Sequence, residues 1–320
     1  MHSAKGVYNG STCRADLLSR RGGKEKHAVY ELIEITNNNY YVNSPTKVGI
    51  YVSSPGEVWL IDSGSDKDAG KKVLRHAEAM GWKIQGILAT HSHADHIGGA
   101  ALIAQRTGCK VYASHAELAF VEHTVYEPAL LWGGCPPQAL RGKAMCAQSV
   151  ECADVRSAPL PAGLEIIPLA GHSPAMFGLR TPEGVFYCAD AVFSAEVVEK
   201  YPLNYLFDLR GTLETLARLT AVDAKWVLPA HADLTEDIGP LRDVNKAKML
   251  EILALIESLC AEPRGFEALL GAIFAHYGLA LNLAQYALGG STLKAYISYL
   301  LDEKRIEPVF EDNRLLWKAV

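Results

Sequence analysis

Short apolar runs and turn-forming residues alternate along the chain from about residue 27 onward. Three of these runs predict strands, and they are separated by segments rich in Asn, Ser, Pro and Gly: Val29–Thr36, Lys47–Val52 and Glu57–Ile61. The apolar spacing that follows predicts a helix from Asp66 to Met80, which Gly81 ends. Another strand, Lys83–Ala89, comes next. Asn37–Asn39 falls between the first two runs and is interpreted as a turn.

The same mixture of strands and helices continues through the middle of the chain. We expect helices at Ala100–Thr107 and Leu213–Thr220, and strands at Lys110–Ala113, Leu164–Leu169, Met176–Thr181, Val185–Cys188 and Lys225–Leu228. Strand hairpins mixed with helices in both halves favour two sheets with helices outside them over a single βαβ ladder. The predicted fold class is therefore α/β, an αββα sandwich.

Two regions depart from this pattern. Residues 123–161 have weak periodicity around a Gly- and Pro-rich centre, and a connection of this length is typical of a lid or binding loop. Residues 244–320 contain three apolar helical stripes, the last with Ser291 as its expected N-cap, followed by a predicted hairpin. This order is typical of a winged-helix-like domain. We therefore divide the chain into a tail (1–26), an α/β domain (27–243) and a helical domain (244–320).

Composition and charge exclude several classes of protein. The chain has 320 residues, of which 49% are hydrophobic and 21% charged, and its formal net charge is −5. These values give no sign of general attraction to nucleic acid or to membranes. Residues 1–26 hold six basic and two acidic residues without apolar periodicity, so we interpret them as a loose tail. No apolar segment near the start suggests a secretory signal, and the seven scattered cysteines fit reduced thiols, so we expect a cytoplasmic protein.

The segment THSHADHIGG, residues 90–99, concentrates metal-binding side chains directly after a predicted strand. His91 and His93 are two positions apart in an extended segment and can therefore bind one cation together. Asp95 and His96 cannot easily crowd the same ion, which points to a second one. Further candidate ligands each follow an apolar strand, at His172, Asp190 and His231. The pattern predicts a metal site along one edge of the sheets.

These residues resemble the signature of the metallo-β-lactamase-fold hydrolases. The motif HxHxDH is met by His91-Ser92-His93-Ala94-Asp95-His96, and the similarity covers about residues 29–243. Leu60-Ile61-Asp62-Ser63-Gly64 looks like the aspartate loop that comes early in this family. The resemblance implies the metallo-β-lactamase fold and a metal-dependent hydrolase of the glyoxalase II and lactonase-like branch.

The resemblance also implies a role for each ligand. The first metal would be held by His91, His93 and His172, the second by Asp95, His96 and His231, and both by Asp190 as a bridge. The metals implied are two Zn²⁺ ions, with iron or mixed metals as alternatives, and they would share a bridging hydroxide as the nucleophile. Asp95 would be the catalytic residue, orienting the hydroxide and carrying a proton to the leaving group. Asp62 is either a partner that orients a ligating histidine or a turn residue.

Several reactions remain open at this stage. The first hypothesis is cleavage of an ester, thioester or lactone of a small metabolite. The alternatives are a phosphodiesterase or endoribonuclease that uses the same metals, and a mononuclear-iron persulfide dioxygenase. Diiron flavoproteins of the family carry glutamate at the position of His93, which argues against that branch. A strict glyoxalase II assignment is also disfavoured, since no second histidine follows His172 closely.

The partners follow from the same observations. We expect a small-molecule substrate and no membrane. Residues 263–320 hold six basic and six acidic side chains, a balance that disfavours a nucleic-acid-binding surface. The C-terminal extension is therefore interpreted as a helical cap that forms a wall of the active-site cleft or makes a homodimer contact. Tyr201 and Tyr205 are candidates for contact with a substrate carbonyl.

Overall fold

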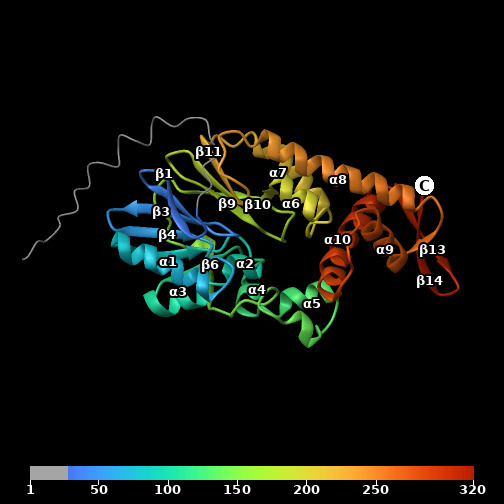
Figure 1. Cartoon of the computed structure of the whole chain (residues 1–320), viewed down its shortest axis with the longest axis horizontal. Helices are drawn as coiled ribbons and strands as arrows, with labels where there is room; N and C mark the ends of the chain where they lie inside the picture. Colours follow the sequence, from blue (N-terminus) through green and yellow to red (C-terminus); the bar gives the residue numbers. More distant parts are fainter. Residues whose placement is uncertain (1–27) are drawn as a thin grey trace, which may run out of the picture.

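The computed structural model describes residues 28–320, and the predicted tail lies outside the described residues. The strands form two large sheets and one small one. The first sheet has seven strands in the order β1 (Glu31–Thr36), β2 (Asn39–Asn43), β3 (Val48–Ser54), β4 (Glu57–Ile61), β5 (Lys83–Leu88), β6 (Lys110–Ala113) and β7 (Cys152–Asp154). The second sheet has the order β11 (Trp226–His231), β10 (Val185–Phe193), β9 (Phe177–Arg180) and β8 (Glu165–Pro168). Figure 1 shows the two sheets side by side with helices on the outer face of each.

The alternation of side chains in β4 explains the layers. Val58 and Leu60 pack into the core beneath the outer helices, α1 (Lys67–Met80) and α3 (Ala100–Thr107). Trp59 and Ile61 point to the other face and join the core between the two sheets. Because successive residues of a strand face opposite sides, a run that is apolar at every position indicates a strand covered on both faces. The predicted αββα sandwich is therefore confirmed.

The second sheet is covered in the same way. The core outside it contains Phe186 and Val192 of β10 together with Leu216 and Leu219 of α7 (Leu209–Leu219). Helix α8 (Gly239–Leu259) also lies against this sheet, where the Asn245 side chain accepts a hydrogen bond from the Phe193 backbone N–H and donates one to its carbonyl. α8 thereby connects the sheet to the C-terminal region.

The predicted helix from Asp66 to Met80 is observed as α1. The Asp66 side chain caps it, accepting from the backbone N–H groups of Asp68 and Ala69. Gly81 ends it in the left-handed conformation with φ 68°, as expected for a residue without a side chain. The helix predicted at Ala100–Thr107 has the predicted bounds as α3.

Two local predictions are wrong. Asn39 does not belong to a turn but begins β2, where its buried side chain donates to Thr36 and Glu183. Ser291 does not cap a helix, because α10 runs from Leu283 to Asp302 and its N-cap is Asn282. The Gly289–Gly290 pair lies inside this helix, and Gly289 is packed so closely against Phe274 that an added Cβ would lie 3.0 Å from its ring.

The segment at 123–161 combines several short elements. It contains α5 (Tyr126–Trp132), which follows α4 (Leu118–Glu122), the 3₁₀ turns η1 (Gln138–Leu140) and η2 (Val155–Ser157), and the edge strand β7. Leu131 and Leu140 from this segment are buried together with Ala287 of α10. The predicted lid is thus packed against the C-terminal region on one side and paired with the first sheet on the other.

The C-terminal residues form their own core. α8 is followed by β12 (Arg264–Gly265), α9 (Phe266–His276), α10, β13 (Ile306–Glu311) and β14 (Arg314–Ala319), and the three strands pair in the order β12-β14-β13. The predicted hairpin is therefore present. α8 continues without a break through residue 243, where the sequence analysis divides the chain. Leu203 and Leu206 of the loop after α6 (Ala195–Lys200) are buried in the same core, which joins the two regions. Among the helices of residues 28–320, none has both the length and the apolar composition required to cross a bilayer.

The loop that carries the histidine cluster is held by a close approach at Gly99. A Cβ added there would lie 2.3 Å from the Ser63 carbonyl oxygen. The contact brings this loop against the segment after β4, where Ser63 donates two hydrogen bonds to the His96 carbonyl. The absence of a side chain at Gly99 is thus a condition for the two loops to meet.

We predict opposite effects of one substitution at two glycines. Gly99→Ala should lower the free energy of unfolding by about 1–3 kcal/mol, because the methyl group overlaps backbone that cannot rotate away. Gly271→Ala, in α9 with no atom within 4 Å of the added Cβ, should raise it by about 0.5–1 kcal/mol. Denaturant titration of the two variants and the parent measures both values. Equal effects at the two positions would contradict the close contact.

Candidate metal centre

The ends of parallel strands bring the first candidate residues together. β4 and β5 are parallel neighbours, so Asp62 after β4 lies beside Thr90 and the histidines after β5. Asp62 is buried in the left-handed conformation with φ 63°, and its carboxylate accepts from the backbone N–H and the hydroxyl of Thr90 and from Nδ1 of His96 at 2.7–2.9 Å. Such backbone conformations are stable only where surrounding contacts hold them. Asp62 therefore orients His96 and is not a cap of α1.

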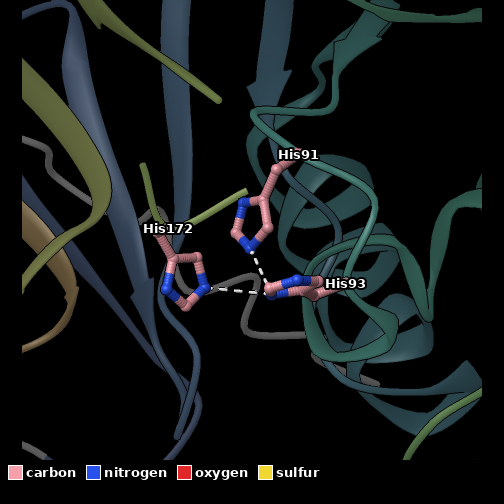
Figure 2. A group of neighbouring side chains, drawn as sticks. All are labelled: His91, His93 and His172. Atoms are coloured by element: carbon pink, nitrogen blue, oxygen red, sulfur yellow. Dashed lines mark hydrogen bonds between the residues drawn. The ribbon is translucent and has the colours of Figure 1, made fainter. Parts of the chain in front are cut away.

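Three histidines from two distant segments meet at one point. His91 Nε2 and His172 Nε2 each lie 3.0 Å from His93 Nδ1, and Figure 2 shows the three rings turned toward one another. His91 and His172 are buried, and His93 is nearly so. Three imidazole nitrogens at this spacing suit a single ion.

The outer nitrogens of the rings are engaged elsewhere. His172 Nδ1 donates to the Tyr205 carbonyl at 3.1 Å, and His231 Nδ1 donates to the Pro45 carbonyl at 3.1 Å. His91 Nδ1 lies 3.1 Å from the Thr90 hydroxyl, which itself donates to Asp62. Because these partners accept a hydrogen bond from Nδ1, the neutral form of each ring carries its proton on Nδ1 and directs the Nε2 lone pair to the centre of the site.

A second group of donors lies beside the first. Asp95 Oδ2 lies 3.3 Å from His231 Nε2 and 3.7 Å from His96 Nε2. The donor atoms of these three residues all lie within 4.8 Å of one another. Asp95 also accepts a hydrogen bond of 2.7 Å from the Thr46 hydroxyl, which holds its carboxylate in place.

Asp190 lies between the two groups. Its Oδ2 is 3.4 Å from both His172 Nε2 and His231 Nε2, and its Oδ1 is 3.2 Å from His96 Nε2. The sequence analysis places Asp190 after a strand that ends at Cys188. In the structure Asp190 lies inside β10, which continues to Phe193. The register of β10 against β11 shifts here and Ala189 takes a left-handed φ of 49°. This bulge is the local cause of the Asp190 orientation.

The charges of the site favour a cation. Burial disfavours a proton on the histidines, but the carboxylates of Asp190, Asp95 and Asp62 outweigh it and hold the pKa of His96 well above its usual value. In the same way, Asp190 and Asp95 raise the pKa of His231 to about 10. A divalent cation supplies the same positive charge without protons on these rings. His172 differs, since burial and the nearby His93 lower its pKa to about 3 and leave its lone pair free.

Two buried polar atoms without hydrogen-bond partners in the described part of the chain show whether these residues fit a metal. His96 Nε2 and Asp190 Oδ1 face each other at 3.2 Å, yet neither has an aligned hydrogen-bond partner within residues 28–320. Buried polar atoms are rarely left in this state without a reason. Both atoms point into the space between the donor groups, where a cation would satisfy them. The residues present therefore fit a metal centre.

The sequence analysis missed Glu117, a fully buried carboxylate behind the histidine loops. It accepts from the Ser92 backbone N–H at 3.2 Å and hydroxyl at 2.6 Å, and from the Ser173 hydroxyl at 2.6 Å and the Ala175 backbone N–H at 3.0 Å. Ser92 stands between His91 and His93, and Ser173 follows His172. Glu117 thus joins the two loops that carry the first donor group. No sequence pattern marks it, because its partners are far apart along the chain.

Glu127 and Tyr205 also contact the first group. Glu127 of α5 lies 3.4 Å from His93 Nε2, the nitrogen that faces away from the centre. The Tyr205 ring makes edge contacts with His93 and His172 at centroid distances of 5.1 and 5.8 Å. Tyr201, the other candidate of the sequence analysis, is 43% exposed and lies beneath Lys200. Of the two tyrosines, only Tyr205 lies against the site.

The remaining histidines stay outside the site. His115 is 78% exposed and lies near Asp154, and His76 bonds to the Tyr30 carbonyl. All seven candidate ligands of the sequence analysis, in contrast, lie within one cluster: His91, His93, Asp95, His96, His172, Asp190 and His231.

Comparison with known proteins agrees with this geometry. The family model of the metallo-beta-lactamase superfamily matches residues 44–231. The hydroxyacylglutathione hydrolase of Polaromonas sp. (strain JS666) is 29% identical over 198 residues, covering 61% of this chain and 62% of that protein. The hydroxyacylglutathione hydrolase of Bradyrhizobium sp. (strain ORS 278) is 49% identical over 43 residues, covering 13% of this chain and 17% of that protein. The chain thus aligns with less than two thirds of the length of either relative.

A solved structure extends the similarity of the fold. The crystal structure of a beta-lactamase domain protein from Burkholderia ambifaria superposes with a TM-score of 0.68 at 16% identity, covering 93% of this chain and 96% of that one. The shared fold therefore reaches well beyond the segment that the family model matches. Since that segment makes up more than half of the chain, this protein belongs to the metallo-β-lactamase superfamily.

Proposed function

We propose that this protein is a dinuclear zinc hydrolase that cleaves an ester, thioester or lactone of a small metabolite. The observation that carries the proposal is the position of Asp190 between two groups of three donors. A carboxylate has two oxygens and a negative charge, so it suits a bridge between two cations. Donor sets rich in imidazole favour zinc. Under this proposal His91, His93 and His172 would hold one ion, Asp95, His96 and His231 would hold the other, and Asp190 would contribute its carboxylate to both.

In the proposed reaction the metal ions and the side chain of Asp95 have different roles. Bound zinc would polarise the substrate carbonyl and lower the pKa of a water molecule toward about 7. Asp95 is the catalytic residue: burial opposes its ionisation, but His96 and His231 hold the pKa of its carboxyl well below the usual range. It is therefore a carboxylate at neutral pH, partly desolvated by its neighbours although 42% of its side chain is exposed. Oδ2 is held by Thr46, which leaves Oδ1 to accept the water proton and pass it to the leaving group.

The choice of a carbonyl substrate rests on two further arguments. The relatives named above are hydroxyacylglutathione hydrolases, and the bond they cleave is a thioester. Residues 263–320 carry equal numbers of basic and acidic side chains, which disfavours binding of a polyanionic phosphodiester. We therefore rank an ester or thioester above RNA or DNA as substrate.

We further infer that residues 244–320 are a winged-helix-like domain that forms a wall of the active-site cleft. Three helices, a short strand between the first two, and a terminal hairpin support this interpretation. α10 contacts both α5 and the region after α6, so the domain borders the site directly. The division at residue 243 follows the sequence pattern and runs through α8.

Metal content is the first test of the proposal. Protein purified without chelator should contain close to two zinc ions per chain by elemental analysis. Asp190→Ala should remove detectable turnover and lower the metal content, since it deletes the bridge. His115→Ala, a substitution at an exposed histidine, should change neither value. A single iron per chain would instead support the persulfide dioxygenase alternative.

The role of Asp62 gives a second prediction. Asp62→Ala should weaken zinc binding by about 10–100-fold, because His96 loses the acceptor that fixes its ring. Asp66→Ala is the matched control, since it removes a carboxylate four residues away that caps α1 and pairs with the exposed Lys143, away from the histidines. It should cost about 1 kcal/mol of folding stability and leave the zinc affinity unchanged. Competition with a chromophoric chelator measures the affinity of each variant.

Substrate class is tested separately. A panel of thioesters and lactones should be hydrolysed by the zinc-loaded protein, and a chelator should abolish the activity. Bis(p-nitrophenyl) phosphate should be cleaved at least about 100-fold more slowly, since the proposed site is built for a carbonyl. Activity confined to the phosphodiester would overturn the proposal and favour the nuclease alternative.

A further inference from the structure

A pocket opens beside the candidate metal centre, and the two share residues. His172 and Asp190, two of the candidate metal ligands, are among the residues that line it. Its other lining residues come from five separate parts of the chain: β10, α6 with the loop after it, α7, α8 and α10. A group that occupies this pocket would therefore extend from the metals toward the C-terminal region.

Three polar side chains that line the pocket, those of Asn245, Thr212 and Lys248, use their polar atoms elsewhere. The Asn245 side chain bonds to the backbone of Phe193 and Leu241. The Thr212 hydroxyl donates to the Asp208 carbonyl. The Lys248 ammonium group donates to both oxygens of Glu251 at 2.7–2.9 Å and lies over the Tyr277 ring. None of these three side chains offers the pocket an unused charge or hydrogen-bonding group.

Aliphatic and aromatic side chains make up most of the remaining lining, to which Asn204 adds one amide. Val198 and Met249 contribute aliphatic side chains to the walls. Phe193 packs against His172 at a centroid distance of 5.7 Å and stacks on His231 at 5.7 Å, while Tyr205 lies against the other side of His172. Aromatic rings thus contact His172 where it lines the pocket, and such surroundings disfavour a charged group.

The pocket is small. Its cavity volume is about 30 Å³, and on the same measure one water molecule needs roughly 10–15 Å³. The space therefore holds a group of a few heavy atoms. A long hydrocarbon chain would require the walls to move.

We propose that this pocket is the acyl subsite and takes a short, uncharged, apolar acyl group of about two to four carbons. The inference rests on the proposed function, because it assumes that the carbonyl of the substrate lies at the metals. Its grounds are the shared residues His172 and Asp190, the engaged polar side chains and the cavity volume. The substrate is accordingly an ester, thioester or lactone with a small aliphatic acyl part.

Straight-chain hydroxamates test the pocket without turnover. Their hydroxamate group binds zinc and their alkyl tail would occupy the pocket. In calorimetric titrations of the zinc-loaded protein, affinity should rise about fourfold per methylene from aceto- to butyrohydroxamate, since each methylene leaves water. It should rise no further for octanohydroxamate. Succinic monohydroxamate, which ends in a carboxylate, should bind at least about tenfold more weakly than butyrohydroxamate.

Two variants on one helix make the test specific. Met249→Ala enlarges the wall and should move the optimum to hexanohydroxamate. Leu250→Ala is the matched control, because its side chain is 48% exposed on the same helix, and it should keep the parent profile. A flat profile in the parent protein, a rise that continues to the octanoyl chain, or preference for the succinic compound would overturn the acyl subsite.

The same compounds separate this inference from the proposed function. If thioesters are hydrolysed but the hydroxamate profile is flat, the acyl subsite is wrong and the proposed function stands. If the profile has the expected shape but the thioester and lactone panel is not hydrolysed, the apolar subsite stands and the proposed reaction is wrong.

Discussion

The buried carboxylate of Asp190 constrains the arrangement of the whole candidate site. It lies within 3.4 Å of imidazole nitrogens of His96, His172 and His231, and one of its oxygens has no aligned hydrogen-bond partner within the described residues. A negative charge at such depth requires positive charge beside it. The rest of the site supplies the donors that would hold that charge as metal ions.

Those donors are held by partners behind them. Asp62 fixes His96, Glu117 joins the loops of His91 and His172, and Glu127 lies against the outer nitrogen of His93. Each of these carboxylates comes from a different segment: the end of β4, the turn before α4, and α5. Rings that are held on the side away from the centre can meet an ion with little loss of conformational freedom. Residues 123–161 therefore support the site through Glu127.

The C-terminal region packs against segments that contact the candidate site. Its core includes Leu203 and Leu206 from the loop after α6, and Tyr205 of the same loop contacts two of the histidines. α8 bonds through Asn245 to Phe193, whose ring stacks on His231. Packing of this region and the position of the metal-facing rings are thus coupled through one loop and one helix.

The sequence by itself determined the layers and the candidate ligands, because both follow from local patterns. Apolar runs flanked by turn residues mark strands covered on both faces, as in β4, and the HxHxDH motif places four donors after β5. Only the tertiary structure decided the rest. The bulge that aims Asp190, the partners of Glu117 and the start of α10 at Leu283 depend on contacts between residues far apart along the chain. Such contacts leave no periodic signal in the sequence, since they are set by packing and by the need to satisfy buried polar groups.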